Sequence, residues 1–186
     1  GLRLVYGAER QQESIDDGST DDSRNQYGYY LEYQGGFGEN LFVTAGARYD
    51  DNDDFGTHTS YRLSSAYLIP LAGGDLKLKG AYGTGFRAPS LYEVAYNNGS
   101  FAYPPASQTS LQEEKSRGYD VGLTWGADSG LYLEAVYFDQ KIDDEIYFDL
   151  ANYSGYLQRN GTTDSSGVEL SAAWPLLASL SLSANY

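Results

Sequence analysis

The protein has 186 residues, no Cys, no Met and a formal net charge of −14 at pH 7. This length is enough for one domain with a sizeable core, and the lack of Cys excludes disulfides and thiolate metal sites. The negative charge argues against a nucleic-acid partner, because the phosphates would be repelled. Since no Met stands even at position 1, we expect a mature or excised piece of a longer chain.

Hydrophobic and polar residues alternate along most of the sequence, beginning near its first residues. Leu76, Leu78 and Tyr82 fall on one face of a stretch whose other face carries Lys77 and Lys79. A period of two predicts strands, and no window of useful length has a competing helical period. In chain order we predict nine strands, near 2–11, 25–34, 41–50, 57–69, 75–86, 115–126, 130–141, 165–174 and 179–186.

The connections between these strands alternate between two kinds. Those at 35–40, 70–74, 127–130 and 175–178 are short, whereas those at 12–24, 51–56, 86–114 and 142–164 are mostly longer and polar. An up-and-down antiparallel sheet places alternate connections at opposite ends, so one end has tight turns and the other has elaborate loops. This asymmetry is typical of outer-membrane barrels.

The chemistry of the two faces supports an all-β, antiparallel, up-and-down transmembrane β-barrel. Several apolar faces end in an aromatic residue, as at Tyr6, Tyr49, Tyr67, Trp125, Tyr137 and Trp174, which suits girdles at the lipid–water interfaces. A soluble β-sandwich or lipocalin-like barrel is the alternative, with the apolar face turned inward. Alternation alone does not say which face is outside, but the loop asymmetry and the small, charged residues of the second face favour the membrane.

Five segments then resemble recurrent segments of TonB-dependent outer-membrane receptors. They are GARYDDNDDFGTH (46–58), YGTGFRAPSLYEVAY (82–96), LQEEKSRGYDVGLTW (111–125), VYFDQKIDDEIYF (136–148) and QRNGTTDSSGVELSAAW (158–174). The most similar branch by eye is the cobalamin-receptor-like group. Gln112-Glu113-Glu114 stands where Pro-Glu is usual, and Asp120 stands where Glu is common. These departures concern the branch and not the family.

The resemblance implies a fold and a function. Family barrels have 22 strands around a plug domain. Residues 1–186 would therefore be a single barrel segment of about nine middle-to-later strands, without the plug and the remaining strands. We expect an active transporter, not an enzyme, that takes up cobalamin, a ferric siderophore or haem across the outer membrane. Its partners would be outer-membrane lipid, its own plug and the TonB complex.

The loop after the strand at 75–86 holds the ligand-binding candidates. They are Arg87, Tyr92, Tyr96, Asn97, Phe101 and Tyr103. Exposed aromatic side chains offer flat apolar area plus hydroxyls, which suits a large metal chelate or corrinoid. The alternative for residues 83–89 is a purely structural role, in which Pro89 ends the strand and Arg87 pairs with a carboxylate on the barrel wall.

Acidic residues gather in the long connections, and one cluster is a calcium candidate. Asp50, Asp51, Asp53 and Asp54 supply the hard oxygen ligands that Ca²⁺ prefers, although the spacing is not that of an EF-hand. Loop calcium in cobalamin receptors makes this a prediction of the resemblance as well. The alternative is a solvated, repulsive loop surface that needs no cofactor.

No catalytic constellation is present. The single His58 has neither a second His nor a Cys beside it, so the sequence offers no credible zinc site. No nucleophile elbow or phosphate-binding loop occurs. The functional alternatives to the transporter are a passive outer-membrane channel, an adhesion or phage-docking barrel, and a soluble β-sandwich binding domain.

Overall fold

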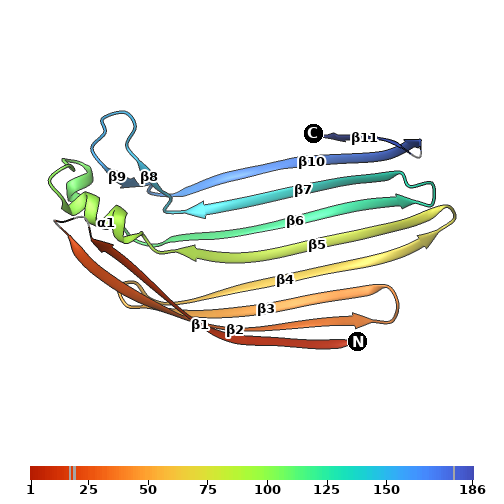
Figure 1. Cartoon of the computed structure of the whole chain (residues 1–186), viewed down its shortest axis with the longest axis horizontal. Helices are drawn as coiled ribbons and strands as arrows, with labels where there is room; N and C mark the ends of the chain where they lie inside the picture. The colour runs from red at the N-terminus through yellow and green to blue at the C-terminus, as the bar shows by residue number, and fades with distance from the viewer. Residues whose placement is uncertain (17, 19, 178) are drawn as a thin grey trace.

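The computed structural model describes the chain except residues 17, 19 and 178, and it is dominated by one antiparallel sheet (Figure 1). Nine described strands form this sheet in the order β1-β2-β3-β4-β5-β6-β7-β10-β11. Their bounds are β1 Leu2–Asp16, β2 Asp21–Phe37, β3 Leu41–Asn52, β4 Gly56–Leu71, β5 Gly74–Arg87, β6 Glu114–Ala127, β7 Tyr132–Asp143, β10 Thr162–Leu177 and β11 Leu180–Asn185. The up-and-down order confirms the predicted all-β architecture.

Four smaller elements lie in the two longest connections. Helix α1 (Leu91–Asn98) and the 3₁₀ turn η1 (Ala106–Gln108) follow β5, whereas the short strands β8 (Ile146–Phe148) and β9 (Tyr156–Gln158) form a hairpin between β7 and β10. Both connections lie at the same end of the sheet (Figure 1). No helix in the described part of the chain is long and apolar enough to cross a membrane.

Two of the predicted loops are largely strand, which corrects the sequence-based boundaries. Residues 12–16 continue β1 and 21–24 begin β2, with Glu13 paired to Arg24 in the ladder. Likewise β3 runs to Asn52, so the connection at 51–56 shrinks to a tight turn before Gly56. The reason is that backbone pairing continues past the apolar band, where both faces are polar and alternation no longer marks a strand.

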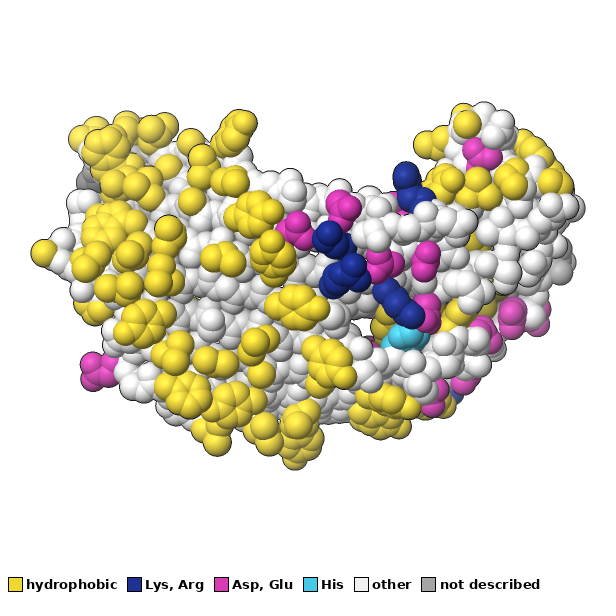
Figure 2. All heavy atoms as spheres, turned by 180° about the vertical axis from the view of Figure 1, so that it is seen from behind, with side chains coloured by type: hydrophobic (Ala, Val, Ile, Leu, Met, Phe, Trp, Pro, Cys, Tyr) yellow, Lys and Arg dark blue, Asp and Glu magenta, His cyan; other side chains and the backbone are white. Residues whose placement is uncertain are grey.

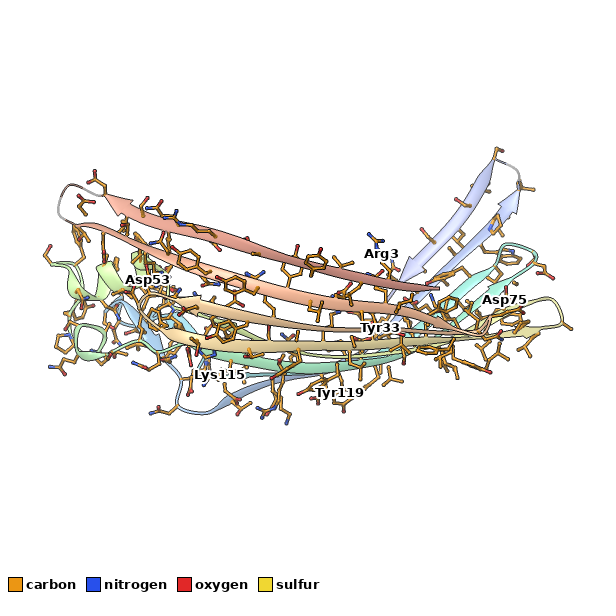
Figure 3. All side chains as sticks on the ribbon, turned by 90° about the horizontal axis from the view of Figure 1, so that it is seen from below. Arg3, Tyr33, Asp53, Asp75, Lys115 and Tyr119 are labelled. Atoms are coloured by element: carbon orange, nitrogen blue, oxygen red, sulfur yellow. The ribbon has the colours of Figure 1, made fainter. Side chains whose placement is uncertain are left out.

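The opposite end of the sheet has tight turns, as predicted. Gly73 and Gly130 adopt φ of 89° and 87°, a left-handed conformation that favours glycine because it has no Cβ. Figure 3 shows Asp75 near this end and Asp53 near the other, with the long strands between them. The two ends of the sheet are therefore built differently, as an outer-membrane barrel wall requires.

The strand register separates an apolar convex face from a polar concave face. Tyr82 pairs with Tyr119, and Val121 with Tyr137, so these side chains share one side of the sheet. Figure 3 shows Tyr119 on the convex side, and Figure 2 shows apolar side chains spread over that surface. Tyr6, Tyr49, Tyr67, Tyr137 and Trp174 are exposed, and Trp125 is half-buried.

The concave face holds the small and charged residues. Lys79 Nζ lies 2.6 Å from Glu134 Oε2, which also accepts hydrogen bonds from the Thr124 and Tyr132 hydroxyls at 2.9 Å. Gly122 lies beneath this ion pair, and a Cβ there would be 2.8 Å from Lys79 Cε. The polar groups thus satisfy one another along the inside of the curved wall.

Candidate functional site

The candidate site is the pair of long connections, which we call the cap: residues 88–113 and 144–161. Helix α1 begins there because Ser90 is an N-cap. Its hydroxyl accepts from the Glu93 N–H at 3.1 Å, and the Glu93 carboxylate accepts from the Ser90 N–H at 2.7 Å. This reciprocal capping box follows the Ser-x-x-Glu pattern, a signal in the sequence that would have predicted the helix.

Asn97 joins the two halves of the cap. Its Nδ2 donates to the Tyr156 carbonyl at 2.8 Å, and its Oδ1 accepts from the Tyr156 N–H at 2.9 Å. The side chain therefore acts as a strand partner for β9, and it is only 5% exposed. In this arrangement the amide of Asn97 holds the cap together, and its polar atoms are already paired.

An aromatic cluster fills the space between α1 and the β8–β9 hairpin. The Tyr96 ring lies 5.7 Å from both Phe148 and Tyr156, and Phe148 lies 5.2 Å from Tyr156, all edge to face. Tyr92 meets the edge of Tyr156 at 6.3 Å. Sequence reasoning found Tyr92 and Tyr96 but missed Phe148 and Tyr156, since no local pattern links segments so far apart.

A further set of contacts closes the tip of the hairpin. The Tyr103 N–H donates to the Ser154 carbonyl at 3.1 Å, and the Tyr103 hydroxyl donates to the Asn152 carbonyl. Asp149 accepts from the Ser154 hydroxyl at 2.7 Å and from the Asn152 N–H at 3.1 Å. These hydrogen bonds hold the pKa of Asp149 below its usual value.

Large exposed side chains on the cap come from both connections, and we call this set of residues the aromatic surface. Phe101 is 79% exposed and Tyr92 is 55% exposed. The members of the aromatic surface are Tyr92, Phe101, Tyr103, Tyr147, Leu150 and Tyr153. Half of them were predicted as ligand contacts, and the hairpin supplies the others. Such a surface can cover a large amphipathic ligand and bind its polar groups through hydroxyls.

Arg87 lies at the base of the cap and is engaged by carboxylates. Its Nε donates to Glu114 at 2.6 Å, and its Nη1 donates to Glu93 at 2.9 Å. This is the structural role that the sequence left open for Arg87, with Glu114 of β6 as the carboxylate on the wall.

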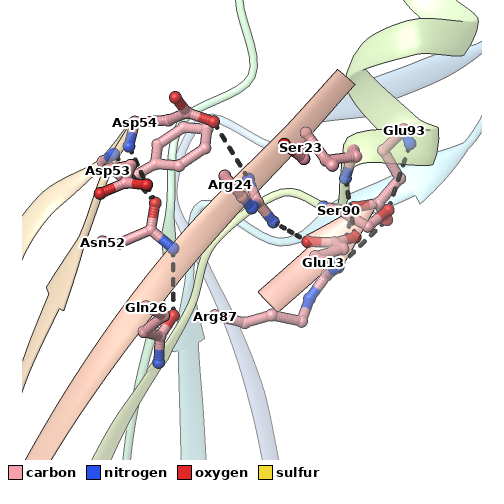
Figure 4. A network of polar contacts seen from close by, with 12 residues as sticks. Glu13, Ser23, Arg24, Gln26, Asn52, Asp53, Asp54, Arg87, Ser90 and Glu93 are labelled. Atoms are coloured by element: carbon pink, nitrogen blue, oxygen red, sulfur yellow. Dashed lines mark hydrogen bonds and ion pairs between the residues drawn. The ribbon is translucent and has the colours of Figure 1, made fainter. Parts of the chain in front are cut away.

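A polar pocket of about 460 Å³ lies on the concave side beneath residues 88–90, and its walls include three arginines. Each arginine is paired. Arg24 Nη2 is 2.6 Å from Glu13, and Arg48 Nη2 is 2.8 Å from Asp50, while Arg87 is held as described above. Figure 4 shows Arg24, Glu13 and Arg87 converging there. The pocket is thus lined by charges that compensate one another.

The four aspartates of the calcium candidate do not converge on a common point. Asp50 is buried against Arg48, Asp53 accepts from the Asn25 N–H at 2.8 Å, and the Asp54 N–H donates to Asn52 at 3.1 Å. Asp51 alternates with Asp50 and so falls on the opposite face of β3. Within the part of the chain that is described, no group of three or more His, Cys, Asp or Glu residues could hold a metal ion.

Ion pairs on the convex face mark the edge of the apolar band that is nearest the cap. The sequence did not reveal this feature. Lys115 pairs with Glu113 at 3.2 Å, Arg117 with Asp143 at 2.8 Å and Lys141 with Asp164 at 3.1 Å. Figure 2 shows this row of charges between the apolar band and the cap. An apolar convex band, a girdle of tyrosines and a polar concave face together define a segment of an outer-membrane β-barrel wall.

The family profile described as "TonB dependent receptor-like, beta-barrel" matches residues 4–186. The chain therefore belongs to the TonB-dependent receptors, and it is an outer-membrane protein. This confirms the family resemblance and overturns the alternative of a soluble β-sandwich. The family is one of receptors and transporters, not of enzymes.

Two curated relatives are similar to the chain. The chain is 28% identical over 182 residues to the vitamin B12 transporter BtuB of Photobacterium profundum, covering 94% of this chain and 28% of that protein. It is 29% identical over 156 residues to the iron-regulated outer membrane virulence protein of Vibrio cholerae, covering 77% of this chain and 23% of that protein. The chain thus spans about a quarter of the length of these relatives.

Two solved structures share the fold. The siderophore receptor PirA of Pseudomonas aeruginosa has a TM-score of 0.82 at 23% identity and covers 99% of this chain and 36% of PirA. The ferric enterobactin receptor PfeA has a TM-score of 0.76 at 20% identity and covers 99% of this chain and 32% of PfeA. The nine-stranded sheet is therefore an arc of a larger barrel architecture.

Proposed function

We propose that this chain forms part of the barrel wall and the cap of a TonB-dependent active transporter, which binds a large, scarce nutrient at the cell surface and imports it across the outer membrane. The observation that carries the proposal is the aromatic surface, exposed on two connections that are fixed to a rigid sheet. Binding sites are commonly built in this way, with contact residues on loops and a scaffold that positions them.

The remaining parts of the transporter would come from outside these residues. The polar concave face suits contact with a plug domain, and the convex face suits outer-membrane lipid. The plug, the other strands and the contact with the TonB complex belong to the rest of the proposed receptor, since the chain covers only 28% of the B12 transporter that it matches. In this account the barrel wall supplies binding surfaces, and the energy for import comes through TonB.

Among cobalamin, ferric siderophores and haem, we favour a corrinoid such as cobalamin. The arginines that line the concave pocket are paired with carboxylates, and the chain carries a formal charge of −14. A polyanionic ferric chelate would be repelled by this field, whereas a neutral corrinoid would not. Apolar area with hydroxyl groups, as on the aromatic surface, suits such a ligand.

Equilibrium binding of the two ligands to the full-length receptor tests this proposal. We expect cyanocobalamin to bind more tightly than a ferric catecholate, and Phe101→Ala and Tyr92→Ala each to weaken binding about five- to tenfold, as for anchor residues of an interface. Tyr119→Ala, on the convex face, is the matched control and should change nothing. Unchanged affinity in the Phe101 and Tyr92 variants would contradict the assignment of the aromatic surface.

Calcium at Asp50, Asp51, Asp53 and Asp54 stays a prediction of the sequence. Its test is the melting temperature of the protein with Ca²⁺ and with a chelator, in the native chain and with all four aspartates changed to Asn. A calcium-dependent rise that the substitutions abolish would support the site. An equal response in both proteins would remove it.

A further inference from the structure

We propose that Arg87 is a positioning residue that fixes both long connections to the barrel wall as one rigid cap, so that the two halves of the aromatic surface act on a ligand together. The part of this inference that concerns a ligand rests on the proposed function. The mechanical part, that one arginine orders two separate connections, stands on the contacts alone.

Arg87 lies where four elements meet. It is the last residue of β5, its Nε donates to Glu114 at the start of β6, and its Nη1 donates to Glu93 of α1. The other carboxylate oxygen of Glu114 accepts the N–H of Ile146, the first residue of β8. One ion pair thus links two strands of the wall to the first element of each connection.

The N-terminus of α1 is held a second time, on the far side of the concave face. The Leu91 N–H donates to Glu13 Oε1 at 3.0 Å, and Glu13 also pairs with Arg24 at 2.6 Å. Because β1 and β5 are four positions apart in the sheet, this contact carries the chain across the mouth of the curved wall. Figure 4 shows Arg87, Glu93, Ser90 and Glu13 around this crossing.

The two connections are also joined to each other. Besides the Asn97–Tyr156 pair, the Gln112 N–H donates to Gln158 Oε1 at 2.8 Å, and Gln158 Nε2 donates to the Gln112 carbonyl at 2.8 Å. Any loosening at the base of one connection is therefore transmitted to the other. This coupling is what makes Arg87 a residue for both connections and not only for the one that follows it.

Arg87 acts through these partners and not by touching a ligand. Glu93 and Glu114 are 12% and 13% exposed, so both carboxylates depend on the guanidinium for compensation. Removing the guanidinium would leave two largely buried charges unpaired. The planar fork of arginine reaches both carboxylates at once, which a lysine ammonium does with poorer geometry.

Amide hydrogen exchange of the full receptor, folded in detergent or nanodiscs, tests the mechanical part. We expect Arg87→Ala to speed exchange about ten- to a hundredfold in both 88–113 and 144–161, the size set by loss of charge-assisted hydrogen bonds. Arg87→Lys should give an intermediate effect in both. If the Arg87→Ala protein fails to fold, Glu93→Gln removes only the negative charge of the α1 contact, and it should speed exchange in both connections by less than about tenfold.

The matched control is Arg117→Ala. Arg117 is on the neighbouring strand β6, is 50% exposed against 45% for Arg87, and pairs with Asp143 at 2.8 Å, but it faces outward. The Arg117→Ala substitution should leave amide exchange in both connections unchanged. A response to Arg87→Ala confined to 88–113, or absent from both, would overturn the proposal.

Binding of cyanocobalamin and of a ferric catecholate to the same variants separates the two proposals. If Arg87→Ala weakens binding in step with faster exchange, the positioning role is supported. If binding falls while exchange is unchanged, Arg87 contacts the ligand directly and the positioning role is wrong. If neither probe binds the native receptor, the proposed ligand fails, and the exchange result still decides the role of Arg87.

Discussion

The wall and the cap differ in where their apolar side chains lie. The buried hydrophobic residues of the described chain, Leu91, Ala106, Leu111 and Ile146, all lie in or beside the cap. Along the wall, large apolar side chains such as Leu63 and Val121 are more than half exposed on the convex face. The cap therefore has a small core of its own, whereas the wall carries its apolar side chains on the outside of the sheet, as outer-membrane barrels do.

The wall and the cap also differ in which groups make their hydrogen bonds. The wall is built from ladders between backbones, which pair over 15 residues between β1 and β2 and over 10 residues between β4 and β5. The cap depends on single side chains that bond to distant backbone groups, such as Asn97 to Tyr156. Damage to the wall is expected to act on the whole fold, and damage to the cap to stay local.

The largest expected effect is a loss of stability caused by one substitution in β4. Leu63→Arg places a charge on the convex face, where a barrel loses about 2–4 kcal/mol near the bilayer midplane. Ser64→Arg, one residue on, places the same side chain on the concave face and should cost much less. Urea unfolding in lipid vesicles measures both, and equal losses would contradict the assignment of the faces.

A smaller effect is expected in the cap. Asn97→Ala leaves the N–H and carbonyl of Tyr156 without their partners, which costs about 1–3 kcal/mol for each buried group left unsatisfied. The loss should appear as faster amide exchange in 88–113 and 144–161 with the wall unaffected. The exposed neighbour Asn98→Ala serves as the control, and global unfolding by Asn97→Ala would refute the division into wall and cap.

The smallest expected effect is an acid sensitivity of the hairpin tip. Hydrogen bonds from Ser154 and the Asn152 N–H lower the pKa of Asp149 from its ordinary 3.8. Its contribution to stability is therefore present above pH 3.8 and is lost as the pH falls through the lowered pKa. As the pH falls through this pKa, the rate of amide exchange in 144–161, corrected for its intrinsic pH dependence, should rise in the native protein. Asp149→Asn should remove the pH dependence.

The wall could be predicted from the sequence because the strands of an outer-membrane barrel alternate apolar outward and polar inward residues, with a period of two. Alternation located the nine strands of the large sheet and the faces of Leu76, Leu78 and Tyr82, but not the short strands β8 and β9. It failed at residues 12–16 and 21–24, where β1 and β2 rise above the apolar band and both faces are polar. The connection between these strands includes residues 17 and 19, which lie outside the described residues.

The cap could be predicted only in part. The Ser90-x-x-Glu93 box is a local signal for α1, and the aromatic content of 92–103 indicated a contact surface. The partners Asn97 and Tyr156 are 59 residues apart, and Arg87 and Glu114 are 27 apart, so no pattern of neighbouring residues links them. Long-range pairs of this kind need the fold before they can be seen.

The accessibility of single nitroxide labels at 60–67 along β4 tests the central claim most directly, because this sequence has no Cys to mutate first. Labels at odd positions, including 61 and 63, should collide with oxygen dissolved in the bilayer. Labels at even positions, including 62 and 64, should instead meet a water-soluble nickel chelate or the protein interior. A strand whose odd positions are protected from oxygen and whose even positions contact lipid would contradict the account.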